Sequence, residues 1–333
     1  FIKVRVLAAP DKFRGSLTAL EATRAIEKAV EESGCSSMGV PLADGGEGTL
    51  DVLGGPNQTM TVTGPLGTPV EAEWRLADRT AVIEVAKASG LTLAGGPEAN
   101  NPLEATTKGT GELIRCALEK GAERIIVGLG GSATTDGGLA ALEAMGSLAR
   151  YKGIELIAAC DVRTDFLSSA DSFAVQKGAT SAELKFLNRR LERITQLYEE
   201  KYGISVQETP RSGAAGGLAG GLLVAGAKLV DGFDFIAQEI GLDEMIVESD
   251  LVITGEGCLD KTSFEGKVIS GVCRYADAAS VPVFIVAGAI SDEVVEKVDC
   301  VSLVETFGEQ QAFSDTERCI ERIVTEHIKL LSQ

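Results

Sequence analysis

The chain has 333 residues, of which 44% are hydrophobic and 24% are charged, so it is long enough to bury the cores of two domains. Its 31 Lys and Arg against 49 Asp and Glu give a formal net charge of −18, which argues against non-specific binding to nucleic acid or an anionic membrane. The 7 cysteines are scattered, with no Cys-x-x-Cys pair, and there is 1 histidine, so neither a disulfide framework nor a zinc site is expected.

The first sixty residues predict a strand, a helix and a second strand. An apolar run predicts a strand at 4–9. A helix is expected over 18–33, where Thr18 and Glu21 have the spacing of a capping box and Gly34 suits the C-terminal stop. The second strand, at 38–42, leads directly into a loop rich in glycine and acidic residues at 44–49.

The middle of the chain has a different pattern. Short strands separated by glycine and proline turns are typical of an antiparallel meander, and they are expected at 59–63, 70–76 and 81–85. The next expected elements are a helix at 111–120, strands at 125–127 and 157–160, and a helix of small residues within 213–226.

Strands and helices alternate again toward the C-terminus. The expected elements are a strand at 251–254, a loop at 255–260, a helix at 267–278, a strand at 283–287, a helix from Asp292, a strand at 300–304 and a helix at 315–331. This alternation predicts an α/β fold with a doubly wound parallel sheet, of the Rossmann or flavodoxin-like kind. Residues 1–60 and 236–333 are expected to form that domain, with a second, mixed α/β domain inserted at 61–235.

One loop concentrates residues that suit phosphate binding. The segment 128–138 follows the strand expected at 125–127 and holds five glycines, three hydroxyl side chains and one carboxylate, Asp136, in eleven residues. Glycines let the backbone come close to a ligand and point several N–H groups at it, and a carboxylate can hold a metal ion or accept a proton. The loop therefore predicts a site for a phosphorylated ligand.

Three further loops, at 9–16, 44–49 and 255–260, follow apparent strands, and ligands collect at the carboxyl ends of strands in open α/β sheets. An acidic protein that binds an anion must concentrate its few cations at the binding site, so Lys or Arg residues near glycines are candidates for that site. These residues are Lys12, Arg14, Lys108, Lys177, Lys261 and Lys267. Phosphoryl transfer requires backbone N–H groups and cations on the phosphates, together with carboxylates that hold Mg²⁺.

Two nucleotide-binding motifs match only in part. Gly128-x-Gly130-x-x-Ala133 fits the dinucleotide fingerprint, but the acidic residue due about twenty positions on is found about thirty on, at Asp161. The segment from Gly255 to Thr262 has the length of a P-loop, yet Asp260 stands where glycine is required. His327 falls on the apolar stripe of the last helix and is expected to pack there.

Together the motifs resemble the type I bacterial glycerate kinase family. The resembling segments follow one another in the family's order between about residues 3 and 325, and they are 9–18, 41–49, 101–103, 106–112, 128–138, 159–162, 176–179, 213–217 and 254–257. The resemblance implies ATP-dependent phosphorylation of D-glycerate, usually to 2-phosphoglycerate, by two α/β domains with the active site in the cleft between them. The chain departs from the family after Asp161, where it is shorter, and at Val175 and Thr262.

ATP and Mg²⁺ are therefore the expected cofactors. We expect catalytic roles for Asp136, Asp44 and Lys12, and metal ligation by Asp44, Asp136 and Asp161. The residues expected to bind the substrate are Arg14, Ser16, Glu47, Thr134, Thr135 and Lys177. The residues expected to contact the nucleotide are Gly130, Gly131, Ser132, Gly255, Glu256 and Lys267.

Two other classes of function stay open from the residues alone. A dehydrogenase would use the 128–138 loop for NAD, and stabilisation by NADH but not by ATP with Mg²⁺ would reveal it. A non-catalytic binding or sensor protein would keep the carboxylates as turn residues and would form no ADP. Unpaired cysteines, with no signal-peptide pattern and no membrane-length apolar run, predict a cytoplasmic protein without membrane or nucleic-acid partners, and a homo-oligomer is compatible with the sequence.

Overall fold

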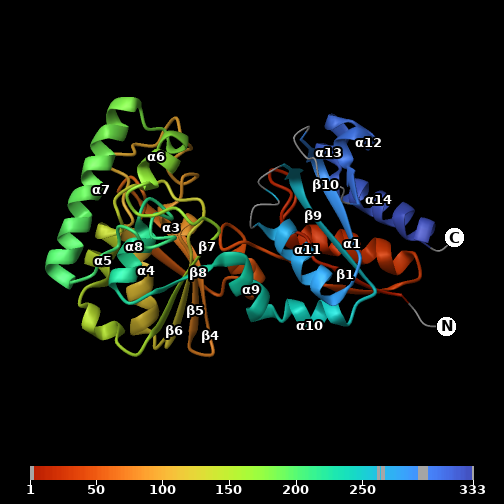
Figure 1. Ribbon diagram of the computed structural model, residues 1–333, viewed down its shortest axis with the longest axis horizontal. Helices are drawn as coiled ribbons and strands as arrows, with labels where there is room; N and C mark the ends of the chain where they lie inside the picture. Colours follow the sequence, from red (N-terminus) through yellow and green to blue (C-terminus); the bar gives the residue numbers. More distant parts are fainter. Residues whose placement is uncertain (1–3, 261–262, 264–266, 292–298, 332–333) are drawn as a thin grey trace. The chain divides into compact units, whose positions relative to one another are not determined.

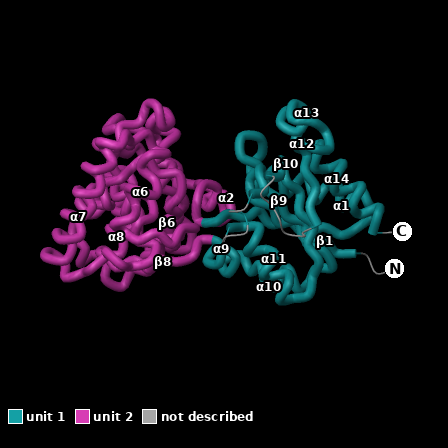
Figure 2. The backbone as a smooth tube through the Cα atoms, turned by 45° about the horizontal axis from the view of Figure 1, so that its top comes forward, with its two compact units in different colours: residues 1–44, 233–333 teal, residues 45–232 magenta. Residues whose placement is uncertain are grey.

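The computed structural model describes residues 4–260, 263, 267–291 and 299–331 (Figure 1). The chain divides into two compact units, of which unit 1 comprises residues 1–44 and 233–333 and unit 2 comprises residues 45–232 (Figure 2). The joins expected near residues 60 and 235 therefore lie at 44–45 and 232–233. The first join falls earlier because the backbone N–H groups of Gly48 and Leu50 donate to Glu84, which belongs to unit 2.

Unit 1 is built on a parallel sheet, as the alternation of strands and helices predicted. Within the described residues its strand order is β11-β10-β9-β1-β2, and all its pairings are parallel. The strands are β1 (Arg5–Ala8), β2 (Ser36–Gly39), β9 (Leu251–Leu259), β10 (Val283–Ile290) and β11 (Cys300–Ser302). Numbered within the unit, this order is 2-1-3-4-5, the flavodoxin-like form of the doubly wound fold.

Helices cover both faces of this sheet because successive strand residues point to opposite sides. Val6 and Ala8 of β1 belong to a core formed with α1 (Ala19–Glu32) and α14 (Thr316–Leu331). Leu7 of β1 belongs to a second core formed with α9 (Gly232–Ile240), α10 (Leu242–Val247) and α11 (Val268–Ala279). The short helices α12 (Leu303–Phe307) and α13 (Glu309–Ser314) add Leu303 and Ala312 to the first core.

Two local expectations in unit 1 are confirmed. Thr18 caps α1 through a reciprocal capping box with Glu21. The ring of His327 on α14 stacks on Phe284 with centroids 3.7 Å apart, so the half-buried histidine packs against the core of unit 1.

Unit 2 has a mixed sheet in the order β3-β4-β5-β6-β7-β8. The strands are β3 (Gln58–Thr63), β4 (Pro69–Ala77), β5 (Thr80–Glu84), β6 (Arg124–Gly128), β7 (Glu155–Cys160) and β8 (Lys228–Asp231). The first three pair antiparallel, as the meander pattern predicted, and β5 to β8 are parallel. The carboxyl ends of β5, β6 and β7 consequently lie at one edge of the sheet, where Glu84, Gly128 and Cys160 end their strands.

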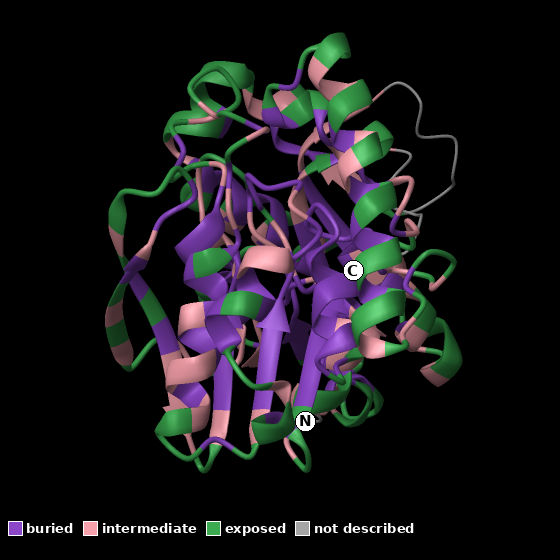
Figure 3. Ribbon diagram, turned by 90° about the vertical axis from the view of Figure 1, so that its left-hand side faces the viewer, coloured by how far each residue is buried: buried purple, intermediate pink, exposed green. Residues whose placement is uncertain are grey.

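The helices of unit 2 pack on this sheet around one core, and the parallel strands β5 to β7 are buried along most of their length (Figure 3). The helices are α2 (Thr49–Val52), α3 (Ala86–Ser89), α4 (Lys108–Glu119), α5 (Leu139–Met145), α6 (Ser169–Phe173), α7 (Ser181–Tyr202) and α8 (Leu218–Val224), with 3-10 turns η1 (Leu148–Tyr151) and η2 (Val175–Lys177). No helix in the described part of the chain has the length and apolar character needed to cross a membrane.

Several elements differ from the sequence expectation. Strand β9 runs on to Leu259, so Gly255 and Glu256 lie in a strand paired with β10 rather than in a loop. The helix expected within 213–226 is confined to 218–224, because Gly216 and Gly217 have positive φ angles of 67° and 87°. The strand expected at 300–304 ends at Ser302, where α12 begins. The helix expected from Asp292 lies outside the described residues.

Candidate active site

The topological switch point of unit 1 lies between β1 and β9. In a doubly wound sheet, ligands bind outside the carboxyl ends of the strands at the point where the strand order reverses. The loop after β1 is fixed there to β9, because the amide of Asp11 donates to the carbonyl of Gly255 at 2.9 Å and the Thr254 hydroxyl donates to the carbonyl of Ala9 at 2.7 Å. These bonds place Asp11 beside the start of the 255–259 segment, which carries Glu256.

Asp11, Asp44 and Glu256 form a group of mutually repelling carboxylates, called here the carboxylate cluster. Burial, together with the charges of Asp44 and Glu256, raises the pKa of Asp11 to about 7 against the opposing effect of Lys12. Burial also raises the pKa of Glu256 to about 7. The Glu256 Oε1 atom is buried without a hydrogen-bond partner in the described structure. Such a cluster holds protons at neutral pH or accepts a cation that relieves the repulsion.

The other residues expected in this loop differ in exposure. Lys12 is half-buried, and its amide donates to Asp11 Oδ1 at 2.7 Å. Arg14 is exposed, while the Ser16 hydroxyl donates to the carbonyl of Phe13 at 3.1 Å. Lys267 is half-buried at the N-cap of α11, where its charge lowers the pKa of Glu256.

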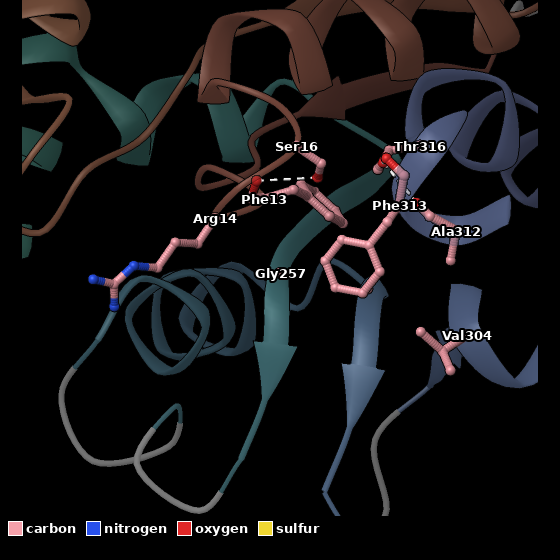
Figure 4. A pocket seen from close by; sticks show the side chains of 9 residues that line it. Phe13, Arg14, Ser16, Gly257, Val304, Ala312, Phe313 and Thr316 are labelled. Atoms are coloured by element: carbon pink, nitrogen blue, oxygen red, sulfur yellow. Dashed lines mark hydrogen bonds between the residues drawn. The ribbon is translucent and has the colours of Figure 1, made fainter. Parts of the chain in front are cut away.

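A small hollow in unit 1 lies beside these residues but collects none of the carboxylates. Its lining includes Phe13, Gly257, Val304 and Phe313, and the Arg14 side chain points away from the aromatic rings (Figure 4). Arg14 and Ser16 also line it, but Asp11 and Glu256 do not, so the carboxylate cluster is not gathered around this hollow.

In unit 2 the 128–138 loop is held by a buried lysine. Lys177 is only 5% exposed, and its Nζ donates to Ser132 Oγ at 2.9 Å and to the Thr134 carbonyl at 2.8 Å. Burial lowers the pKa of Lys177 to about 7, and the nearby charge of Asp136 opposes that shift. The amine is therefore close to half-protonated at neutral pH, and an anion brought near it would favour the charged form.

The hydroxyls of the loop face inward. Ser132, Thr134 and Thr135 are at most 5% exposed. The Thr135 Oγ1 atom is buried without a hydrogen-bond partner in the described structure. Gly131 is exposed and Gly130 half-buried, so the open part of the loop is its glycine backbone. That backbone, rather than the hydroxyls, is the part that could meet a phosphate in this conformation.

Asp136 joins the loop to the start of α4. Its Oδ2 accepts hydrogen bonds from both the amide and the hydroxyl of Thr107 at 2.8 Å, and its Oδ1 accepts one from the Gly138 amide at 3.1 Å. Burial raises the pKa of Asp136, although these bonds and the charge of Arg190 act in the opposite direction. Three accepted bonds show that Asp136 organises the loop.

Some glycines of the loop are required by packing of backbone on backbone. A Cβ at Gly130 would overlap Gly46 of the 45–49 loop, and one at Gly138 would lie 2.9 Å from Leu218 Cα. A Cβ at Gly216 would overlap the carbonyl oxygen of Thr134. The sequence led us to expect that these glycines let a ligand come close to the backbone. At Gly130, Gly138 and Gly216 the absent side chain instead makes room for neighbouring segments of unit 2.

The structure distributes the predicted residues over the two units. Those in unit 1 are Lys12, Arg14, Ser16, Asp44, Gly255, Glu256 and Lys267. Those in unit 2 are Glu47, Gly130, Gly131, Ser132, Thr134, Thr135, Asp136, Asp161 and Lys177. Of the predicted metal ligands, Asp44 thus belongs to one unit and Asp136 and Asp161 to the other. In the described ranges, no group of three or more His, Cys, Asp or Glu side chains is arranged to hold a metal ion.

Sequence reasoning missed four residues that organise these loops. Asp11 belongs to the first loop, and its acidic character next to Lys12 was the available signal. Thr107 and Glu84 act through backbone contacts that only the fold reveals. Arg211 donates to the carbonyls of Cys160 and Val162 and pairs with Asp231 at 2.9 Å, which fixes the chain on both sides of Asp161.

Unit 1 is a flavodoxin-like α/β unit with carboxylates at its switch point, and unit 2 is an α/β unit whose glycine-rich loop lies over a buried lysine. These features are typical of the class of enzymes that bind and transfer phosphate groups. Residues 6–150 and 147–332 match the model of the glycerate kinase family, and the chain belongs to that family. It is accordingly a kinase, as predicted, and the dehydrogenase and sensor alternatives are not supported.

Named relatives agree over most of their length. A glycerate kinase of Bacillus subtilis is 38% identical over 328 residues, covering 86% of each chain. A glycerate 2-kinase of Escherichia coli is 36% identical over 331 residues, covering 87% of each. A crystal structure named for glycerate kinase 2 of Salmonella typhimurium LT2 matches with a TM-score of 0.85 and 32% identity, covering 99% of this chain and 98% of that one. The predicted fold class and family are thus confirmed.

Proposed function

We propose that this protein transfers the γ-phosphoryl group of ATP to D-glycerate with Mg²⁺, and that the product is 2-phosphoglycerate. The observation that carries the proposal is the match to the glycerate kinase family along nearly the whole chain. Relatives named glycerate kinase and glycerate 2-kinase support the substrate and the position of the phosphate. The cleft implied by the resemblance, a homo-oligomer and a cytoplasmic location stay predictions.

The carboxylate cluster suits Mg²⁺. Magnesium is usually held by one or two carboxylates together with phosphate oxygens and water, so it does not require a cage of three protein ligands. Asp44 and Glu256 are the residues that would hold it, because Glu256 Oε1 is buried without a partner in the described structure and both charges raise the pKa of Asp11. Bound Mg²⁺ would offset negative charge on the phosphates of ATP.

The remaining groups of the cluster would orient the acceptor. In the transfer, a glycerate hydroxyl oxygen would form a bond to Pγ, the bond between Pγ and the bridging oxygen of ADP would break, and the hydroxyl proton would pass to a base such as the Asp11 carboxylate. Asp11 suits orientation of that hydroxyl because its carboxylate stands at the switch point and is half-buried. Lys12, and the exposed Arg14 nearby, suit pairing with the carboxylate of glycerate.

In unit 2, the exposed backbone of Gly130 and Gly131 suits phosphate oxygens, with Lys177 supplying charge from beneath the loop. Asp136 stays a predicted catalytic residue and metal ligand, and Asp161 stays a predicted metal ligand. The three hydrogen bonds that Asp136 accepts favour a role in holding the loop.

The test is to incubate the protein with ATP, Mg²⁺ and D-glycerate and to identify the product by phosphorus NMR. We expect the signal of 2-phosphoglycerate to grow together with that of ADP and to require Mg²⁺. Formation of 3-phosphoglycerate would overturn the proposed position of transfer, and ADP formation that does not depend on glycerate would overturn the substrate.

A further inference from the structure

Glu84 is a buried carboxylate to which neither the sequence nor the proposed chemistry gives a role. It is the last residue of β5, at the carboxyl edge of the unit 2 sheet, and it is 2% exposed. Its Oε1 accepts hydrogen bonds from the amides of Gly48 at 3.0 Å and Leu50 at 2.7 Å. Its Oε2 is buried and has no hydrogen-bond partner in the described structure. A carboxylate is rarely buried in this way without a purpose, because desolvation of its charge is costly.

The two amides that Glu84 holds lie at the C-terminal end of the 45–49 loop, on either side of Thr49. Gly48 has a φ of 100° and is the N-cap of α2, so its N–H has no partner within the helix. Thr49 closes the turn from inside, since its hydroxyl donates to the carbonyl of Gly46 at 2.7 Å. Glu47 lies between these anchored positions and is exposed. The conformation that displays Glu47 therefore depends on the bonds to Glu84.

Glu84 also lies beside the start of the 128–138 loop. It is in register with Gly128 of β6, and the amide of the next residue, Val85, donates to the Gly128 carbonyl at 3.0 Å. The 45–49 loop approaches so closely that a Cβ at Gly128 would lie 2.9 Å from the carbonyl oxygen of Gly45. One carboxylate thus fixes the 45–49 loop against the loop proposed to bind phosphate.

We infer that Glu84 is a positioning residue, which holds the 45–49 loop against Gly128 and Gly130 and thereby sets the place of Glu47 relative to the phosphate-binding backbone. The inference rests on the proposed function, in which those loops handle ATP and glycerate. Glu84 acts by accepting two N–H groups on one oxygen. Its negative charge is not required for that, and the unpartnered Oε2 is consistent with a role that uses only half of the carboxylate.

Three substitutions separate acceptance from charge. Glu84→Gln keeps an oxygen that can accept both amides and removes the charge, whereas Glu84→Asp keeps the charge and withdraws the carboxylate by one methylene. Glu84→Ala removes both. We expect kcat/KM for glycerate to stay within about 3-fold of wild type in Glu84→Gln, and to fall at least about 10-fold in Glu84→Asp and Glu84→Ala, because small displacements of reacting groups reduce rate steeply.

The matched control is Glu183→Ala in the same unit. Glu183 also accepts a backbone amide, that of Thr180 at 2.7 Å, but it caps α7 and touches neither loop. We expect Glu183→Ala to lower the melting temperature while kcat/KM stays within about 2-fold of wild type, as a loss of a cap alone predicts. A loss of kcat/KM in Glu84→Asp no larger than that in this control would overturn the inference. Full activity of Glu84→Asp with an inactive Glu84→Gln would also overturn it, by showing that the charge is what matters.

Amide hydrogen exchange of the peptide covering residues 45–52 gives a reading that needs no catalysis. We expect protection close to wild type in Glu84→Gln and exchange at least about 10-fold faster in Glu84→Asp, because an unanchored loop opens more often. Equal protection in the two variants would refute the positioning role of Glu84, even if Glu84→Ala does not fold. Absence of glycerate kinase activity in the wild type would overturn the proposed function, whereas this exchange comparison would still decide whether Glu84 holds the loop.

Discussion

Asp11 combines three properties of a functional carboxylate: it stands at the switch point of unit 1, it is half-buried, and its pKa is raised to about 7. Asp11→Asn keeps an oxygen that can accept the Lys12 amide and removes the charge. We expect kcat to fall at least about 100-fold, the lower range for loss of a group that orients or accepts a proton. A coupled assay of ADP formation measures the effect.

The control for Asp11 is Asp250→Asn in the same unit. Asp250 accepts the amide of Arg5 at 2.8 Å before β9 begins and is exposed, so kcat should stay within about 2-fold of wild type. If Asp11→Asn retained more than a tenth of the wild-type kcat at pH 8, Asp11 would have no direct part in the reaction.

Asp136 is expected to matter for stability as well as for activity. Its two oxygens accept three hydrogen bonds, and asparagine can offer only one accepting oxygen, so Asp136→Asn leaves at least one loop amide unpaired. Loss of a partner for a buried donor costs about 1–3 kcal/mol. We expect Asp136→Asn to lower the melting temperature by roughly 2 °C or more, since about 1 kcal/mol shifts the melting temperature of a unit of this size by about 2–4 °C.

Calorimetry checks this expectation, with Thr107→Val as the companion variant because it removes only the hydroxyl donated to Asp136. A large loss of activity in Asp136→Asn with an unchanged melting temperature would instead support the chemical role that the sequence predicted.

At the residue scale, the sequence predicts polar groups whose signal is local. Asp136 and Lys177 stand beside glycines and Lys12 lies in the same loop as Gly15, so they could be proposed as candidates without the fold. Glu84 and Thr107 could not, because Glu84 accepts the amide of Leu50, 34 positions away, and Thr107 donates its amide and hydroxyl to Asp136, 29 positions away. Burial is equally invisible in the sequence, and it places Lys177, which the sequence led us to expect in substrate binding, beneath the loop as a buried support.

Among the elements, the turn before α8 should tolerate substitution least. Gly216 has a φ of 67°, and a Cβ there would overlap the Thr134 carbonyl, so Gly216→Ala adds a steric clash to backbone strain. Gly203 ends α7 with a φ of 69°, and no atom lies within 4 Å of the position that a Cβ would take there, so Gly203→Ala carries the strain alone. We expect a loss of about 1 kcal/mol in unfolding free energy for Gly203→Ala.

Gly216→Ala should lose at least about 2 kcal/mol, because overpacking against a fixed backbone typically adds about 1–3 kcal/mol to the loss from strain. Urea denaturation of both variants measures the difference. Equal losses would show that the loop at Thr134 moves aside freely, and the packing of these loops would then not account for the glycine.

The elements themselves were predicted where hydrophobic periodicity and capping act within a segment, as in α1, α14 and the strands of unit 1. The prediction failed at 255–259, where two glycines and a glutamate are typical of a loop but the chain continues β9. Gly255 fits there because its missing side chain makes room for the Val286 carbonyl of β10. That requirement arises between strands and leaves no periodic signal in the sequence.

For the whole molecule, the alternation of strands and helices was sufficient to predict a doubly wound unit and an inserted mixed unit. The position of the first join was less accurate, since it depends on which unit the 45–49 loop bonds to. Two bonds to Glu84 decide that question, and neither composition nor turn propensity carries that information.

The two units should respond differently to pH above 7, because unit 2 holds the buried Lys177 in addition to two carboxylates, Glu84 and Asp136, whose pKa is raised. In unit 1, Asp11 and Glu256 have pKa values raised to about 7, so between about pH 5 and 7 the folded state binds more protons than the unfolded state and stability falls as pH rises. His327, whose pKa burial lowers, acts weakly in the opposite direction. In unit 2, Lys177 has a pKa lowered to about 7, so above pH 7 the unfolded state binds more protons and stability rises with pH.

Hydrogen exchange in magnesium-free buffer can follow each unit through its own strands, β9 for unit 1 and β6 for unit 2. We expect protection of β9 to fall from pH 5 to 7 after correction for intrinsic exchange, and protection of β6 to rise from pH 7 to 9. Lys177→Met should abolish the rise in β6 and leave the fall in β9 unchanged, because the methionine cannot bind a proton and lies in the other unit. A rise in β6 that persists in Lys177→Met would show that the buried amine is not its cause.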